Sequence, residues 1–384
     1  MAKNSSSPDE SGHRMPQLMR AARMHAVGEP FRVEQVERPI PRPKDVLVKV
    51  KACGIVPNLA NVLSRLKERS PYLALPELPA IFGLDAAGVV VEKGAQCHGV
   101  EVGQRVYVNP ARSCGSCRSC RMGDTTSCDY FTFGGYFGFS SRSEAIFRDY
   151  PYAGLAEYMT APQDSLVTLP DNVSFEAAAR WGYLGTGHGA LRRAGANMST
   201  TVLINGVTGT LGLGVALLAL ALGVRKIFGA ARNVELLEKV RQIAPDRIQV
   251  HSLEEALPLS AWVRSVNGGD GVDIAIDALA HGAPHASVLQ GVEALRRGGR
   301  HVNIGGVKGG VPIEIHKMMA RNQTMIGSLW FTTAHGQEMA DLAASELLNL
   351  DVLRHRIFGL EEANGALEAV ESRAGGFTNC VVCP

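Results

Sequence analysis

Two hydrophobic patterns divide the chain. From residue 19 to about 182, short apolar runs such as VLVKVKACGI, AAGVVVEKG and RVYVNP are broken by proline and glycine, which predicts an irregular, largely antiparallel β domain. From 183 to 329, strand-like runs such as TVLIN, KIFGAAR and VDIAIDAL alternate with helical patterns such as LGLGVALLALAL and VELLEKVRQIA. This alternation predicts an α/β fold with a parallel, doubly wound sheet.

The two ends of the chain have patterns of their own. Residues 1–18 are polar, lack the apolar segment of a secretory signal and predict a disordered tail. Residues 330–384 have a helix-rich pattern that ends in the strand-like FTNCVVCP, whose last residues we expect to be frayed. The one long apolar stretch, TLGLGVALLALALGV, is short for a membrane span and predicts a buried helix.

Composition narrows the class of protein. A chain of 384 residues, 46% hydrophobic and 20% charged, has enough apolar side chains for two globular domains. The net charge of +2 provides no strong field toward nucleic acid or an anionic membrane, and no basic cluster is interleaved with aromatic residues. We therefore expect a soluble, cytoplasmic protein with a small-molecule substrate and neither a nucleic-acid nor a membrane partner.

Four of the eight cysteines lie together in RSCGSCRSCRMGDTTSCD, residues 112–129. They are Cys114, Cys117, Cys120 and Cys128. Thiolates at this spacing can surround one tetrahedral zinc, and an all-cysteine shell leaves no coordination position for water or substrate. The sequence therefore predicts one structural zinc per chain. The second C-x-x-C pair, Cys380 and Cys383, lies at the expected frayed end, and we assign it no redox role.

A glycine-rich turn, INGVTGTLG, follows the first strand of the alternating region and opens a helix. Glycines in this context let the backbone approach a pyrophosphate, while the start of the helix offers free N–H groups. The predicted cofactor-binding residues of this turn are Gly206, Thr208, Gly209, Thr210, Leu211 and Gly212.

The end of the next strand predicts which dinucleotide binds. An acidic side chain there would hold the ribose hydroxyls of NAD, but this chain has Ala231 followed by Arg232. An arginine at this point can pair with a 2′-phosphate. The sequence therefore favours NADP, with NAD as the alternative cofactor.

The cysteine lobe, the glycine turn, PELPAIFGLDAAGVV and EVGQRVYVNP together resemble the zinc-type alcohol dehydrogenases of the medium-chain dehydrogenase/reductase superfamily. The resemblance covers nearly the whole chain from about residue 20. It implies a GroES-like catalytic domain over 19–182 with a zinc lobe at about 110–130, a Rossmann domain over 183–329, and a return to the catalytic domain over 330–384. It also implies a homodimer or homotetramer, with MIGSLWF, residues 325–331, as the candidate edge strand and contact.

The resemblance fails at the family's catalytic zinc. Its three ligand positions fall on Val56, Leu84 and Gly182, none of which coordinates a metal, and its proton-relay positions fall on Asn58 and Asn61. The GIVPN segment is instead similar to one in zinc-free quinone and enoyl reductases of the same superfamily. These enzymes reduce a polarised double bond by hydride transfer from NADPH.

Five side chains are candidates for hydrogen-bond or proton donation in such a reaction. They are Asp85, Asn58, Asn61, Tyr183 and His188, with Asp85 as proton donor if burial raises its pKa. Each also has a structural interpretation: the asparagines as helix caps, His188 as a core residue, and Asp85 as an acceptor of backbone hydrogen bonds.

Three functional hypotheses follow. The first is an NADP(H)-dependent reductase of activated C=C or C=N bonds that works without catalytic zinc. The second is alcohol/carbonyl interconversion with side-chain donors in place of the metal. The third is an NADPH-binding sensor without turnover, which would bind the cofactor and reduce no acceptor.

Overall fold

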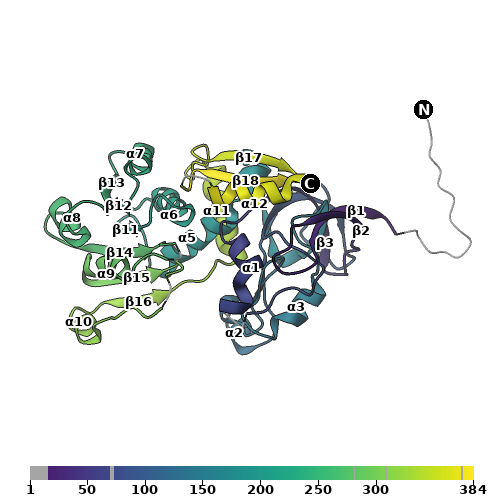
Figure 1. Ribbon diagram of the computed structural model, residues 1–384, viewed down its shortest axis with the longest axis horizontal. Helices are drawn as coiled ribbons and strands as arrows, with labels where there is room; N and C mark the ends of the chain where they lie inside the picture. Colours follow the sequence, from purple (N-terminus) through teal and green to yellow (C-terminus); the bar gives the residue numbers. More distant parts are fainter. Residues whose placement is uncertain (1–15, 70–72, 281, 308, 373–374) are drawn as a thin grey trace, which may run out of the picture.

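The computed structural model describes residues 16–69, 73–280, 282–307, 309–372 and 375–384. The predicted disordered tail, 1–18, therefore lies mostly outside the described residues, and strand β1 already begins at Leu18. Two lobes lie side by side in Figure 1, one built on β11–β16 and the other on the remaining strands. Within the described residues, no helix combines the length and apolar content that crossing a membrane requires.

The first lobe contains a seven-stranded sheet with a mostly antiparallel ladder. Its path is β10 (Leu166–Thr168), β6 (Arg105–Val108), β5 (Asp85–Lys93), β3 (Asp45–Gly54), β18 (Thr378–Cys383) and β17 (Arg354–Gly359), with β9 (Tyr158–Pro162) also paired to β3. Two small sheets accompany it: β2 (Arg32–Glu37), β1 (Leu18–Met24) and β4 (Ala80–Ile81) form one, and β7 (Ala111–Arg112) with β8 (Thr132–Phe133) the other.

Short helices and turns connect these strands. They are α1 (Leu59–Arg69), α2 (Arg118–Arg121), η1 (Thr125–Ser127), α3 (Ser143–Asp149), η2 (Gln163–Ser165), α4 (Phe175–Ala178), α11 (Thr333–Ala344), η3 (Leu360–Glu362) and α12 (Ala363–Ser372). Helix α5 (Trp181–Arg193) leads into the second lobe, and its inner face is almost wholly buried.

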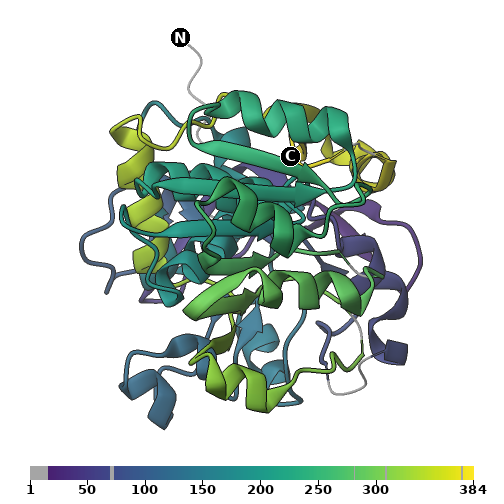
Figure 2. The ribbon, with the colours of Figure 1, turned by 90° about the vertical axis from the view of Figure 1, so that its left-hand side faces the viewer.

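The second lobe is a six-stranded parallel sheet with helices on its faces (Figure 2). The strand order is β13 (Ile248–Ser252), β12 (Lys226–Ala231), β11 (Thr201–Asn205), β14 (Val272–Asp277), β15 (Leu295–Asn303) and β16 (Thr324–Gly327). Its helices are α6 (Thr210–Ala221), α7 (Val234–Ile243), α8 (Leu259–Val266), α9 (His285–Glu293) and α10 (Ile315–Ala320). The order reverses at β11, so this doubly wound sheet has its switch point where the glycine turn begins.

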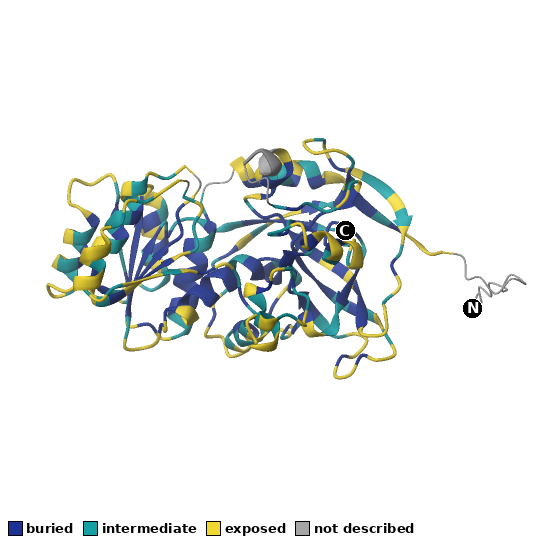
Figure 3. Cartoon of the chain, turned by 90° about the horizontal axis from the view of Figure 1, so that it is seen from below, coloured by how far each residue is buried: buried dark blue, intermediate teal, exposed yellow. Residues whose placement is uncertain are grey.

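Burial follows the sequence pattern. In Figure 3 the strands of both sheets form the buried interior, while the outer helices carry the exposed residues. Helix α6, formed by the long apolar stretch, is buried along most of its length, as expected for a helix packed inside the fold. Strand β16 is different, because it ends the sheet and its side chains are largely exposed.

The C-terminus is not frayed, which corrects the expectation from its terminal position. Strand β18 lies between β3 and β17 in the large sheet, with Val382 opposite Cys53, and Cys380 is buried. Backbone pairing on both sides fixes these residues, which sequence alone does not reveal because both partner strands are distant in the chain.

Candidate active site

The four clustered cysteines place their sulfur atoms close enough together to bind one metal ion. Their Sγ atoms all lie within 4.8 Å of one another, with 3.5 Å between Cys117 and Cys120 and 3.6 Å between Cys114 and Cys128. A zinc ion with metal–sulfur bonds of about 2.3 Å needs sulfur–sulfur separations of about 3.8 Å, close to these values. Backbone N–H groups of Cys117 and Tyr130 donate to sulfurs of the set, at 3.4 and 3.3 Å, and stabilise their thiolate form.

The metal bound by the segment around these four cysteines is structural. The cysteines lie around α2 and η1, a segment too short to have a core of its own, and Asp124 tightens it by accepting from the hydroxyls of Thr126 and Ser127. With four thiolates the zinc shell is closed, so the ion crosslinks the loop and leaves no position for a substrate.

Metal analysis of the purified protein should give about one zinc per chain, because one closed cysteine site is present and the family's second site has lost its ligands. Inductively coupled plasma mass spectrometry on protein freed of loosely bound metal measures this ratio. Replacing Cys117 with serine should lower it toward zero and lower the melting temperature. A ratio near two in the starting protein would show a second metal site.

The glycine turn has the backbone geometry that a pyrophosphate requires. Gly206 follows β11 with φ at +88°, a conformation that side chains disfavour. A Cβ on Gly212 would lie 2.2 Å from the carbonyl oxygen of Gly206, so only glycine lets helix α6 approach the turn this closely. Gly209 is the N-cap of α6, and the first N–H groups of that helix point toward the turn. These residues fit the phosphates of a dinucleotide.

A second segment, from the end of the chain, crosses this turn. The N–H of Gly376 donates to the carbonyl oxygen of Thr208 at 2.8 Å, and the guanidinium of Arg180 donates to the carbonyl oxygen of Gly376 at 2.6 Å. These two hydrogen bonds hold the segment around Gly376, which leads into β18 of the first lobe, against the glycine turn. Arg232, after β12, is exposed.

Asp85 is the centre of a buried polar cluster between the lobes. Its carboxyl group is 1% exposed, and its Oδ1 accepts from the hydroxyl of Tyr107 at 2.7 Å and from the N–H of Gly182 at 3.1 Å. The ring of Tyr107 is fixed in turn by Trp181 and Phe331, with ring centroids at 6.4 and 6.5 Å. Tyr107 therefore has one orientation, with its hydroxyl directed at Asp85.

Burial raises the pKa of Asp85 to about 7, against the opposing effect of the hydrogen bonds from Tyr107 and Gly182 and the charge of Arg180. Near neutral pH the carboxyl group is thus a mixture of acid and carboxylate. Both hydrogen bonds fall on Oδ1, which leaves Oδ2 as the oxygen that carries the proton in the acid form.

The positions of the family's catalytic zinc ligands are closed to a metal. Val56 and Leu84 are buried apolar residues. At Gly182 a Cβ would lie 2.2 Å from Oδ1 of Asp85 and 2.7 Å from Oδ2, so the carboxyl group occupies the space of a third ligand's side chain. The residues present do not fit a zinc ion here.

The predicted catalytic residues separate into two groups. Asp85 and Tyr183 line one narrow cavity together with Val56, Arg180 and Thr210 of the cofactor turn. Asn58 precedes α1 near this cavity and forms a side-chain hydrogen bond with Tyr136.

Asn61 and His188 lie apart from that cavity. Asn61 is exposed on α1. His188 is fully buried in α5, with Nε2 2.8 Å from Oε2 of Glu338 in α11, and burial lowers its pKa to about 4. A neutral histidine held by Glu338 between two helices joins α5 to α11, which agrees with its interpretation as a core residue.

Sequence reasoning missed two tyrosines of this site. Tyr107 lies in a strand, within the EVGQRVYVNP stretch that carries the family resemblance but gives this tyrosine no role, and Tyr136 lies in an aromatic-rich loop. Burial raises the pKa of Tyr136 well above its usual value, and the nearby Tyr183 and Asp85 add to this shift. The hydrogen bond with Asn58 acts in the opposite direction.

The one sequence signal that pointed to Tyr136 was the density of aromatic residues after the cysteines. That loop packs onto Trp330, whose ring centroid is 4.6 Å from that of Phe133.

Comparison with known proteins gives the family. Residues 42–171 match the alcohol dehydrogenase GroES-like domain, and residues 210–345 match the zinc-binding dehydrogenase domain. The chain belongs to the zinc-type alcohol dehydrogenase family of the medium-chain dehydrogenase/reductase superfamily. It is thus an NAD(P)-dependent oxidoreductase with a GroES-like part and a Rossmann part.

Individual relatives are distant but span nearly the whole chain. A probable D-xylulose reductase A of Aspergillus clavatus is 27% identical, covering 88% of this chain and 90% of its own. An NAD-dependent alcohol dehydrogenase of Sulfolobus acidocaldarius is 28% identical, with coverage of 92% and 96%. A putative zinc-binding dehydrogenase of Sinorhizobium meliloti 1021, solved bound to NADP, is 25% identical with a TM-score of 0.80, covering 96% of this chain and all of its own.

Proposed function

We propose that this protein is an NADP(H)-dependent reductase that transfers hydride to an activated C=C or C=N bond of a small organic substrate without a catalytic zinc. The observation that carries the proposal is the contact between Asp85 and Gly182, which puts a protonatable carboxyl group in the space that the side chain of the family's third zinc ligand would take. A metal Lewis acid is replaced there by a proton donor.

The cofactor is assigned from the turn and from the residue after β12. Ala231 cannot hold ribose hydroxyls, whereas the exposed Arg232 can pair with a 2′-phosphate. A bound NADP supports this assignment in one distant relative, while another is named NAD-dependent. NADPH supplies a hydride when it is bound.

The residues of the cavity have separate tasks in the proposed reaction. Asp85 gives its Oδ2 proton to the atom of the double bond that does not receive hydride, and becomes a carboxylate. Tyr107 holds Oδ1 and so keeps the proton on the oxygen that remains free for transfer. The cavity has a volume of about 10 Å³, which is room for about one water molecule, so we place the acceptor at its opening, where Tyr183 would orient it, with the Asn58–Tyr136 pair nearby.

The GIVPN segment favours a C=C or C=N acceptor, because it is similar to a segment of zinc-free quinone and enoyl reductases, whereas the need for a proton is shared by all three kinds of acceptor. Hydride addition to such a bond leaves a carbanion or amide anion that needs a proton at once, and an acid of pKa near 7 can deliver it. The second candidate is carbonyl reduction to an alcohol, which the names of the D-xylulose reductase and alcohol dehydrogenase relatives favour. The third, a sensor, would keep the turn and Arg232 but need no acid.

The test is a screen of NADPH oxidation at 340 nm with enones, cyclic imines, quinones, aldehydes and ketones. We expect turnover with an enone or imine, unchanged by a chelator that leaves the cysteine-bound zinc in place. Turnover with aldehydes or ketones alone would support the second candidate. NADPH binding without turnover of any acceptor would support the sensor.

We propose further that the protein forms a homodimer or homotetramer through the exposed edge strand β16, whose backbone groups are available for pairing with a second copy. Met325 in this strand and Leu329 just after it are each 41% exposed and would be covered. The end of the candidate contact, residues 325–331, is not available to a second copy, because Phe331 is buried against the first lobe.

A further inference from the structure

A cleft of about 800 Å³ opens between the two lobes on the side of α7 and β17. Figure 1 shows these two elements on the same side of the molecule, one from each lobe. The cleft is lined by Leu236, Lys239, Gln242, Ile243, Val352, Arg354, Arg356, Ala369, Ser372, Phe377, Thr378 and Cys380. Among these described residues three carry a positive charge and none carries a carboxylate.

The three positively charged side chains, those of Lys239, Arg354 and Arg356, face the same cleft. Arg354 and Arg356 are two residues apart on β17, so their side chains leave the strand on one face. Lys239 is three residues after Leu236 on α7, which places both on one side of that helix. The adjacent carboxylate, Glu238, is held by Arg241, with Oε1 and Nη2 2.7 Å apart, and does not neutralise Lys239.

The cleft also has an apolar floor. Leu236, Ile243, Val352 and Phe377 are partly exposed hydrophobic residues that line it. Concave apolar walls strengthen the field of nearby cations, and arginine forks match the oxygens of phosphate. We propose that this cleft is a binding site for a phosphate monoester with an apolar body, held by Arg354, Arg356 and Lys239.

The proposed site is separate from the glycine turn yet connected to it. A Cβ on Gly375 would lie 2.7 Å from the side chain of Leu236 and 3.1 Å from the carbonyl oxygen of Thr208, so the chain here stands between the cleft and the turn. Phe377, next to Gly376, lines the cleft. An occupant that joins α7 to β17 therefore also affects how tightly Gly376 is held on Thr208.

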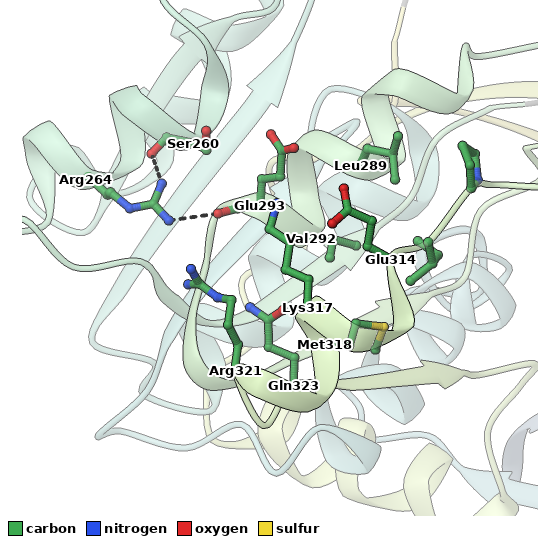
Figure 4. A pocket seen from close by; sticks show the side chains of 12 residues that line it. Ser260, Arg264, Leu289, Val292, Glu293, Glu314, Lys317, Met318, Arg321 and Gln323 are labelled. Carbon is green, nitrogen blue, oxygen red and sulfur yellow. Dashed lines mark hydrogen bonds between the residues drawn. The ribbon is translucent and has the colours of Figure 1, made fainter.

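Another cavity has cations that are already bound by backbone oxygens or accompanied by carboxylates. It has about 280 Å³ and lies between α8, α9 and α10 (Figure 4). There Arg264 donates to the carbonyl oxygens of Ser260 and Glu293, at 2.8 and 2.9 Å, and the carboxylates of Glu293 and Glu314 also line the space. Arg321 likewise donates to the carbonyl oxygen of Leu295 at 2.8 Å, so both arginines of this cavity already bind backbone oxygens. The two carboxylates offset part of the charge of Arg264, Arg321 and Lys317.

The phosphate group has two sources, a free phosphorylated metabolite or the 2′-phosphate of the cofactor. Calorimetric titration of the zinc-loaded full chain with phenyl phosphate and with inorganic phosphate, at constant ionic strength in chloride, tests the site. We expect saturable binding, with phenyl phosphate tighter, and at least a tenfold loss of affinity in the double variant Arg354→Gln/Arg356→Gln. The control Arg193→Gln/Arg225→Gln removes two exposed arginines elsewhere and should bind normally.

Repeating the titration with saturating NADH or NADPH separates the sources. Phenyl phosphate binding that persists beside NADPH identifies a second ligand. If phenyl phosphate binding is lost beside NADPH but not beside NADH, and the double variant loses affinity for NADPH but not for NADH, the ligand is the 2′-phosphate of the cofactor. The NADPH affinity of Arg232→Ala then measures how much Arg232 contributes to binding that phosphate. The proposal is overturned if neither phosphate binds saturably, or if the double variant binds both phosphates and NADPH like the starting protein.

Discussion

Asp85→Asn should lower turnover with the preferred acceptor by ~10²–10⁴-fold, the usual cost of losing a general acid. An asparagine keeps the size of the side chain and an Oδ1 that accepts from Tyr107 and Gly182, but its amide has no proton acidic enough to transfer. Steady-state rates of NADPH oxidation at pH 6 to 9 measure the loss. The starting protein should slow as pH rises past about 7, where Asp85 loses its proton, and the variant should lack this limb.

Stability should also fall as pH rises, but over a lower range of pH. The pKa of Asp85 is raised in the folded state, so between pH ~4 and 7 the native chain holds a proton that the unfolded chain has released. The stabilising contribution of Asp85 is complete below pH ~4 and is lost as pH rises through this window. Denaturant midpoints of Asp85→Asn should therefore depend less on pH there, with the exposed Asp171→Asn as control. Full turnover in a folded Asp85→Asn would remove Asp85 as the acid.

Gly182→Ala should destabilise the protein by about 1–3 kcal/mol, the range for overpacking a filled core. The added Cβ would lie 2.2 Å from Oδ1 of Asp85, and both groups are buried within packed structure. Either the carboxyl group or the start of α5 must shift, and the hydrogen bond between them is lost. Urea unfolding followed by circular dichroism measures the change.

Gly365→Ala is the matched control, since it is also a helical glycine but has open space around its Cβ. It should be neutral or stabilising by up to about 1 kcal/mol, the intrinsic gain of alanine over glycine in a helix. In an Asp85→Ala background, Gly182→Ala should cost less than alone, with a coupling of about 0.5–3 kcal/mol. Equal cost in both backgrounds would show that Asp85 does not occupy the space beside Gly182.

The features that the sequence predicted are those specified by neighbouring residues. The spacing of the cysteines within one short segment predicted the metal site. The glycines between a strand and a helix predicted the cofactor turn. Close approach at Gly212 and positive φ at Gly206 follow from that local pattern. Family resemblance then located the positions Val56, Leu84 and Gly182, whose side chains carry no ligand atoms.

What the sequence could not predict depends on distant packing. The contact of Tyr107 with Asp85 joins strands β6 and β5, and the contact of Asp85 with Gly182 joins residues 97 apart in the chain. His188 was a reasonable candidate by residue type, but its partner Glu338 is 150 residues away. Titration behaviour follows burial and partners, so it becomes visible only once the chain is folded.

The place of β18 between β3 and β17 has a consequence for synthesis. Residues 378–383 are synthesised long after β3, yet β3 needs them to complete its hydrogen bonds at Cys53 and Gly54. The Rossmann half is continuous and can fold while translation proceeds, but the half made first keeps an open strand edge until β18 has been synthesised. A chain that ends or stalls before β18 therefore exposes an unpaired strand edge that can pair with other chains and aggregate. We expect chaperones to matter most for the protein before β18 is added.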